Sequence, residues 1–236
     1  MVGAIGLNGP RLPPASGRPA RQLVVLLHGY GADGNDLIVL APYWQRLLPD
    51  AAFVSPHAPE RIPGAPQGYQ WFSLSNYDPN AMRRDPRRAA DIYRSMRFGA
   101  ESAAKQLNGF LDAELLRLKL SDDSLALVGF SQGTMMSLYV GLRRARPCRC
   151  IVGFSGALVG GEQLKSEIVS RPPVLLIHGD ADDLVPIEAM LGAVEGLGAN
   201  EVAVQWHVSR GIGHSIGEDG LMIAGAFLAD NFRRAP

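Results

Sequence analysis

Gly129-Phe130-Ser131-Gln132-Gly133 is the stretch on which the prediction of the fold depends. It follows an apolar run, 125–128, and precedes a segment of helical composition, 134–144. A strand, a tight turn with Ser at its apex and a helix form the context of the G-x-S-x-G nucleophile elbow. The flanking glycines lack a Cβ, so the strand and the helix can approach each other closely. A glycine-rich turn with an incidental Ser has the same five letters, so the rest of the chain must decide.

Short apolar runs alternate with helical patterns along the chain. We predict strands at 23–27, 51–55, 124–130, 150–155, 173–178 and 202–208. Helices are expected from residue 35 or 36 to about 48 and over 88–118, 134–146, 188–196 and 221–232. Such alternation favours a mainly parallel, doubly wound α/β sheet flanked by helices. In such a sheet the ligand site lies beyond the carboxyl ends of the strands.

Length and composition favour one domain over 22–236, preceded by a flexible tail over 1–21. Lys+Arg and Asp+Glu are both 23, so no net charge favours a nucleic-acid partner. No apolar run approaches the ~18 residues of a membrane helix, so no membrane insertion is expected. Cys148 and Cys150 match neither a redox nor a metal-binding pattern, which favours structural thiols. The tail lacks the apolar region of a secretory signal, so we expect a cytoplasmic protein.

The segment 57–87 has a different composition from the rest of the chain. It combines repeated prolines with several aromatic residues, Tyr69, Trp71, Phe72 and Tyr77. A long connection with little regular structure is usually functional, such as a lid or the wall of a binding site. The aromatic side chains could line a pocket near the active site or fix the loop to the body of the protein. The sequence leaves both interpretations open.

A nucleophilic serine needs a base, which is usually His, and a carboxylate that orients the base. His28 and His178 lie at strand ends before Gly, His207 lies within a strand, and His57 begins the proline-rich segment. His214 lies in a loop between the last strand and the last helix, and it is the candidate base.

The acid should precede this base in the chain, since the order behind a G-x-S-x-G elbow is Ser, acid, His. The loop 179–186 contains three carboxylates, Asp180, Asp182 and Asp183. Residue types and positions alone do not separate these three, because each is also a plausible turn residue or helix cap.

The oxyanion that forms during acyl transfer needs preorganised hydrogen-bond donors. One expected donor is the backbone N–H of Gln132, directly after the nucleophile. The other should come from the loop after an early strand, and His28-Gly29-Tyr30-Gly31 fits this position, with the Tyr30 N–H as donor.

Four motifs together resemble the phospholipase/carboxylesterase family of α/β-hydrolases, which includes the acyl-protein thioesterases. They are 26–31 (LLHGYG), 129–133 (GFSQG), 178–186 (HGDADDLVP) and 213–215 (GHS), and the resemblance extends over about 23–232. It implies an α/β-hydrolase fold with Ser131 as nucleophile, Asp182 as triad acid and His214 as base. It also implies an oxyanion hole of Tyr30 and Gln132 N–H groups. Trp71 matches an aromatic residue near the site, and Leu184 matches a position that lines the acyl pocket.

Two positions depart from the family pattern. Thr134 stands where the family often has a second Gly, and Ala157 stands where the thioesterases carry a bulky aromatic residue. These departures favour a general serine carboxylesterase acting on small-molecule esters, without metal or cofactor, as a monomer or homodimer. A lysophospholipase or an acyl-protein thioesterase with the same triad is the alternative enzyme. A non-catalytic binding protein of the same fold is the alternative outside enzymes, although such proteins have normally lost a triad residue.

Overall fold

The computed structural model describes residues 6–74, 77–78 and 85–233. In these ranges, one sheet of seven strands has the order β1-β3-β2-β6-β7-β8-β9, and β4 and β5 form a separate hairpin. The strands are β1 (Arg11–Leu12), β2 (Gln22–Leu27), β3 (Ala51–Val54), β4 (Glu60–Ile62), β5 (Ala65–Gln70), β6 (Leu125–Phe130), β7 (Cys150–Phe154), β8 (Val174–Gly179) and β9 (Val204–Ser209). All neighbours in the large sheet pair in parallel except β1 and β3, which are antiparallel. The sheet is therefore mainly parallel, as the sequence predicts.

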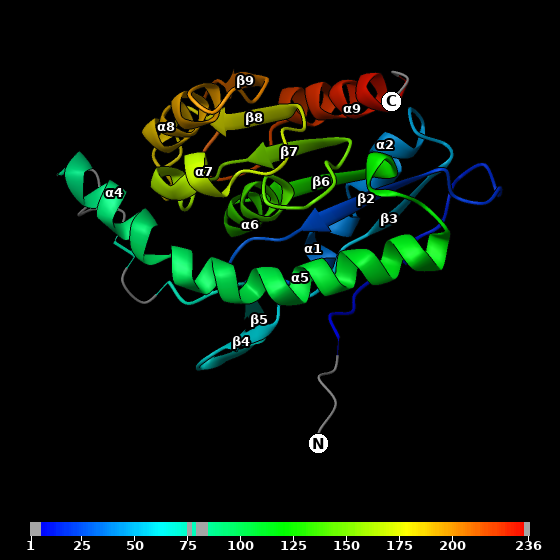
Figure 1. The fold of residues 1–236 in the computed structure, drawn as a ribbon, viewed down its shortest axis with the longest axis horizontal. Coiled ribbons are helices and arrows are strands. Elements are labelled where there is room, and N and C mark those ends of the chain that lie inside the picture. The colour runs from blue at the N-terminus through cyan, green and yellow to red at the C-terminus, as the bar shows by residue number, and fades with distance from the viewer. Residues whose placement is uncertain (1–5, 75–76, 79–84, 234–236) are drawn as a thin grey trace.

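Helices cover both faces of the sheet (Figure 1). They are α1 (Gly34–Ile38), α2 (Ala41–Gln45), α4 (Pro86–Ser95), α5 (Arg97–Leu118), α6 (Gln132–Gly141), α7 (Gly161–Glu167), α8 (Ile187–Gly198) and α9 (Glu218–Arg233), with a 3₁₀ turn at Asp122–Ser124. One core cluster joins the sheet to α5, α6, α7 and α8, and the other joins it to α1, α2 and α9. Because both faces are covered, the central strands β7 and β8 are buried along their whole length. No described helix combines the length and the hydropathy needed to cross a membrane.

The N-terminal segment is more ordered than the expected flexible tail, of which residues 1–5 lie outside the described part. Arg11–Leu12 forms β1, in which Arg11 pairs with Val54 of β3. Arg11 also donates from Nε and Nη2 to Oε1 of Glu114 in α5, at 3.1 and 2.6 Å. A two-residue strand has too short a pattern to be recognised in sequence, and its partner Glu114 is a hundred residues away.

The first two predicted helices are each divided into two in the structure. The helix expected up to about residue 48 begins after Asp33, whose carboxylate accepts from the Asn35 N–H, and α1 ends at Ile38. Pro42, which lacks an N–H, lies in the first turn of α2, where that donor is not needed. The predicted helix 88–118 is divided at Met96 into α4 and α5.

Gly99 and Gly109 both lie inside α5 and do not interrupt it. A Cβ on Gly99 would lie 2.5 Å from Cβ of Phe72, so the glycine allows α5 to pack directly on this aromatic residue. In the proline-rich segment the structure adds the hairpin β4–β5, while residues 75–76 and 79–84 lie outside the described ranges. The short helix α7 was not predicted, since Leu164 is the one buried apolar residue among its seven.

Candidate active site

The turn at Ser131 has the geometry of a strained elbow. Ser131 has φ 54° and ψ −117°, a region that residues with a side chain rarely occupy. Its N–H donates to the Phe154 carbonyl at 2.8 Å, which fixes the turn to β7. A Cβ on Gly133 would lie 1.8 Å from the Leu27 carbonyl oxygen, and one on Gly129 would lie 2.3 Å from the Gly133 carbonyl carbon. The two glycines therefore permit the close approach that the motif requires, and the surrounding packing holds the strain at Ser131.

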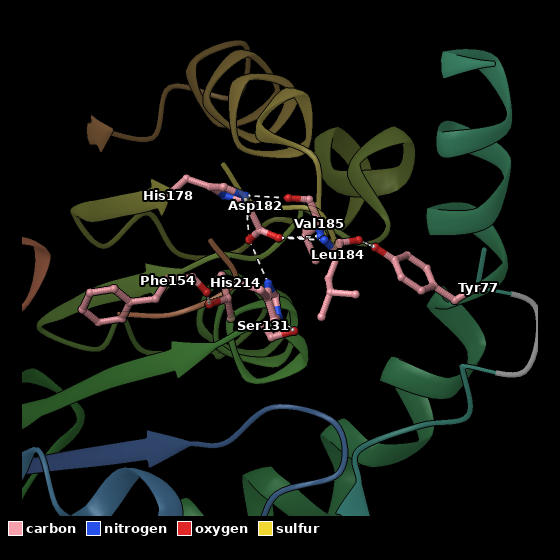
Figure 2. Close-up of polar contacts among 9 residues, drawn as sticks. Tyr77, Ser131, Phe154, His178, Asp182, Leu184, Val185 and His214 are labelled. Atoms are coloured by element: carbon pink, nitrogen blue, oxygen red, sulfur yellow. Dashed lines mark hydrogen bonds and ion pairs between the residues drawn. The ribbon is translucent and has the colours of Figure 1, made fainter. Parts of the chain in front are cut away.

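The structure brings Ser131, His214 and Asp182 together at the carboxyl ends of the strands (Figure 2). Nε2 of His214 lies 3.0 Å from the Ser131 Oγ, and Nδ1 lies 2.8 Å from Oδ2 of Asp182. The carboxylate can only accept, so Nδ1 carries the proton and Nε2 is free to accept from the serine hydroxyl. The Phe130 ring lies 4.9 Å from the imidazole, centre to centre, and limits its movement.

The Asp182 carboxylate is buried and held by several donors. Oδ1 accepts from the backbone N–H groups of Leu184 and Val185, at 3.0 and 2.9 Å. Nε2 of His178 donates to the Val185 carbonyl at 2.8 Å and lies 3.4 Å from Oδ2 of Asp182. Burial raises the pKa of Asp182, but the hydrogen bonds from His178, His214 and Val185 outweigh it and leave the pKa well below its usual range. The group is therefore a carboxylate throughout the physiological pH range.

Asp180, another carboxylate of this loop, has a different partner. Its Oδ1 accepts from the Gly211 N–H at 2.6 Å, so it connects the acid loop to the loop that carries His214. The sequence alone left Asp180, Asp182 and Asp183 unresolved, and the structure places Asp182 against the imidazole.

Three other histidines have contacts of their own. His28 is fully buried, with Nδ1 2.8 Å from the Gly29 carbonyl and Nε2 accepting from the Ala58 N–H at 3.0 Å. Burial is the main cause that lowers the pKa of His28, so this ring is neutral and fixes the start of the 28–31 loop. His57 accepts from the Gly34 N–H, and His207 pairs with Asp219 in α9.

The loop expected to supply an oxyanion donor lies against the nucleophile. A Cβ on Gly29 would lie 3.3 Å from Cβ of Ser131. The Gly31 N–H donates to the Tyr69 carbonyl at 2.9 Å, which holds the loop on β5. The Gln132 N–H is the first of α6, where the N–H groups have no partner within the helix. The loop that carries Tyr30 therefore lies against Ser131 through Gly29, and the Gln132 N–H follows Ser131 directly in the chain.

The amide side chain of Gln132 has a contact that sequence reasoning missed. Its Oε1 accepts from the Trp71 N–H at 2.8 Å, and its Nε2 donates to the Phe72 carbonyl at 2.7 Å. This side chain thus pairs with the backbone as a peptide group would, and it fixes the aromatic segment to the elbow. Trp71 is 1 % exposed, and its Nε1 donates to the His28 carbonyl at 3.0 Å. Trp71 therefore holds the start of the 28–31 loop through this hydrogen bond.

Leu184 lies at the surface beside the triad. Its side chain is exposed, and its carbonyl accepts a hydrogen bond from the Tyr77 hydroxyl (Figure 2). The sequence left two interpretations of the aromatic segment open. The hydrogen bonds of Tyr77 and Trp71 favour the one in which aromatic residues fix the segment to the body of the protein.

The departure at Thr134 has a structural explanation. The Thr134 Oγ1 lies 2.8 Å from the Gly129 carbonyl oxygen and 2.7 Å from that of Phe154. A Cβ on Gly153 or on Gly156 would lie 2.4 Å from the Thr134 side chain. The threonine therefore fills the space that these two glycines leave and connects the elbow to β7.

Within the described ranges, no cluster of three or more His, Cys, Asp or Glu side chains is arranged to bind a metal ion. Cys148 and Cys150 are buried free thiols, and burial raises the pKa of Cys148 to about 12. A thiol with so high a pKa is unreactive at neutral pH.

The chain is similar to several known proteins. Residues 14–232 match the family described as Phospholipase/Carboxylesterase. The crystal structure of esterase PE8 is similar, with a TM-score of 0.85 and 44 % identity over 96 % of this chain and 99 % of that one. Acyl-protein thioesterase 1 of Saccharomyces cerevisiae is 30 % identical over 77 % of this chain and 78 % of its own length. Esterase YpfH of Escherichia coli is 24 % identical over 88 % of this chain and 82 % of its own. The chain therefore belongs to the phospholipase/carboxylesterase family of α/β-hydrolases.

Proposed function

We propose that this protein is a serine carboxylesterase that hydrolyses small-molecule esters through an acyl-enzyme on Ser131. The observation that carries the proposal is the unbroken hydrogen-bonded series Ser131–His214–Asp182, with distances of 3.0 and 2.8 Å. A nucleophile, a base within reach of it and a carboxylate that orients the base are the requirements for this type of catalysis.

In the first step, the Ser131 Oγ attacks the ester carbonyl carbon and its proton passes to Nε2 of His214. The imidazolium then protonates the leaving alcohol as the carbon–oxygen bond breaks, and the acyl group stays on Ser131. A water molecule next gives a proton to Nε2 of His214 as its oxygen attacks the acyl carbon. The bond between that carbon and the Ser131 Oγ then breaks, the imidazolium returns its proton to the Oγ, and the carboxylic acid leaves. Asp182 stabilises the imidazolium in both halves of the reaction, since it remains ionised.

The negative charge on the carbonyl oxygen needs donors that are fixed before the reaction begins. We assign this role to the Tyr30 and Gln132 N–H groups, each worth about 3–4 kcal/mol of transition-state stabilisation. The contacts of His28 and Trp71 support the assignment, because they hold the Tyr30 loop rigidly. Leu184 is the residue that we expect to contact the substrate beside the scissile bond.

An acyl-thioesterase is the second candidate, because several relatives are thioesterases by name and the same triad cleaves thioesters. Against protein deacylation stands Ala157, which is small and buried where the thioesterases have a bulky aromatic residue. We further propose a cytoplasmic location. The two buried free thiols fit a reducing compartment.

The test is hydrolysis of p-nitrophenyl acetate and of a matched acetyl thioester by the parent protein and by Ser131→Ala. We expect the ester to be the better substrate and the substitution to lower kcat by about 10⁶. A variant that keeps most of its esterase activity would refute the role of Ser131. A parent protein that strongly prefers the thioester would favour the second candidate.

A further inference from the structure

The loop 210–217, which carries His214, connects the edge strand β9 to the helix α9, and one carboxylate joins its two ends. Asp219 lies in the first turn of α9. Its Oδ2 lies 2.7 Å from Nε2 of His207, and its Oδ1 accepts from the Ser209 hydroxyl at 3.0 Å. His207 and Ser209 are alternate residues of β9, so their side chains point to the same face of the sheet. The carboxylate therefore holds β9 and α9 together at the base of the catalytic loop.

The Asp219 carboxylate is charged and closely packed. The hydrogen bond from His207 is the main cause that lowers the pKa of Asp219, so the group is ionised at neutral pH. Ser209 is buried, and a Cβ on Gly217 would lie 2.6 Å from Oδ1 of Asp219. The glycine thus lets the end of the loop pass directly against the carboxylate. Hydrogen bonds to an ionised acceptor are stronger than neutral ones, which suits a group that closes a loop.

The two halves of the His214 loop are held by different partners. Gly211 and Ile212, which precede the catalytic histidine, bond to the acid loop through an N–H at 2.6 Å and a carbonyl at 3.0 Å. The half that follows His214 leads directly into the turn of α9 that Asp219 holds against β9. The path of the chain out of the active site therefore depends on this carboxylate.

We propose that Asp219 is a positioning residue for catalysis, which closes the His214 loop and so places the imidazole between Ser131 and Asp182. The inference rests on the proposed function, since it needs His214 to act as the base. A ring that must accept from Ser131 at 3.0 Å and donate to Asp182 at 2.8 Å tolerates little displacement. A misplacement of about 1 Å in a catalytic arrangement can cost about 10² in rate.

The first turn of α9 offers a matched set of substitutions. Asp219→Ala removes both hydrogen bonds to β9. Asp219→Asn is the conservative variant, because its amide oxygen can accept from His207 and its amide nitrogen can donate to the Ser209 hydroxyl oxygen. Glu218→Ala is the control, since Glu218 is the adjacent, exposed carboxylate of the same turn and its removal changes the charge at the helix N-terminus equally.

The first measurement is kcat and kcat/KM for p-nitrophenyl acetate. Asp219→Ala should lower both by the same factor, about 10- to 100-fold, because the imidazole acts in the transition state and not in substrate binding. Asp219→Asn should restore most of the loss, and Glu218→Ala should stay within about twofold of the parent. Should Asp219→Ala fail to fold, Ser209→Ala removes one of the two bonds and should lower kcat by about threefold or more.

The second measurement separates positioning of the imidazole from support of the fold. His214→Ala keeps a residual rate above that of water, because the oxyanion donors remain. Adding Asp219→Ala to this variant should lower the residual rate no further, since the group through which Asp219 acts is already absent. A residue that only maintains the folded fraction would lower the rate by the same factor with or without His214.

An unchanged kcat in Asp219→Ala, or in Ser209→Ala where it takes its place, would overturn the proposal. Equal losses in the presence and absence of His214 would also overturn it, and so would equal losses in Asp219→Ala and Glu218→Ala. Failure of the proposed function is a separate result. Hydrolysis by the parent that is insensitive to Ser131→Ala would refute that function, whatever the Asp219 variants show.

Discussion

Asp182 receives more hydrogen bonds than its proposed role as partner of His214 requires. Two backbone N–H groups and His178 hold it in addition to the imidazole. Because the carboxylate cannot rotate, it fixes the imidazole tautomer that accepts from Ser131. We expect Asp182→Asn to lower kcat for p-nitrophenyl acetate by about 10⁴, since an amide permits the wrong tautomer.

Asp180→Asn is the matched control, because the amide oxygen can still accept from the Gly211 N–H. It should change kcat by less than about tenfold, because the hydrogen bond from Gly211 is kept and only its acceptor changes from a charged to a neutral oxygen. Equal losses in the two variants would show that the acid has been wrongly assigned.

Gln132 combines two separate tasks at one position. Its backbone N–H is a proposed oxyanion donor, whereas its side chain pairs with the backbone of Trp71 and Phe72. Gln132→Ala keeps the first and removes the second, leaving two buried backbone groups unpaired at a cost of about 1–3 kcal/mol for each group. The free energy of unfolding, measured by denaturant titration, should fall by that amount, and kcat should fall with it.

Gln132→Glu separates the two hydrogen bonds, because a carboxylate still accepts from Trp71 but cannot donate to Phe72. It should be less active than the parent at neutral pH. An alanine variant as stable and as active as the parent would exclude a positioning role for the amide.

At the scale of elements, the short strand β1 is tied to α5 through a buried carboxylate. Glu114 is 4 % exposed and pairs with Arg11 of β1 and with Arg117 of its own helix. Burial raises the pKa of Glu114, but the hydrogen bonds from the two arginines outweigh it, so the pKa is lowered on folding. A carboxylate with a lowered pKa contributes stability above its unfolded pKa of about 4.3, and this contribution is lost as pH falls through the folded value.

Glu114→Gln should therefore lower the free energy of unfolding by about 1–3 kcal/mol at pH 7. The difference from the parent should shrink below about pH 4, where the carboxylate of the parent is protonated in the unfolded chain and then in the folded one. Thermal unfolding of both proteins between pH 3 and pH 7 checks this. A difference that is constant over this range would show that packing, and not the ion pairs, connects β1 to α5.

The elements that sequence predicted well have a strong local signal. The buried strands β2, β6, β7 and β8 are continuous apolar runs that end in Gly or at a turn, and the structure confirms them within two residues. The missed features depend on distant partners: β1 on Glu114, and the direct packing of α5 on Phe72 through Gly99. Local pattern contains no information about such partners.

At the scale of the whole molecule, the order of the strands explains why the candidate site could be predicted. Ser131, Asp182 and His214 follow β6, β8 and β9, which lie near one another in a parallel sheet, so their carboxyl ends meet at one edge (Figure 1). Position at a strand end was visible in the sequence. The choice among the three carboxylates was not, because it depends on how the loop 179–186 folds around His178 and Val185.

The arrangement of the helices also explains a feature that no local sequence pattern predicts. A cavity lies between α7 and α8 because small residues from several separate segments face one another, and α7 itself gave no clear signal.

The central claim is that Ser131 is the nucleophile, and covalent labelling tests it most directly. The protein is treated with a fluorophosphonate, its esterase activity is followed during the reaction, and the modified residue is identified by mass spectrometry of peptides. We predict one adduct, on Ser131, formed in step with the loss of hydrolysis and absent in Ser131→Ala. Hydrolysis that survives complete labelling of Ser131, or an inactivating adduct on another residue, would contradict the account.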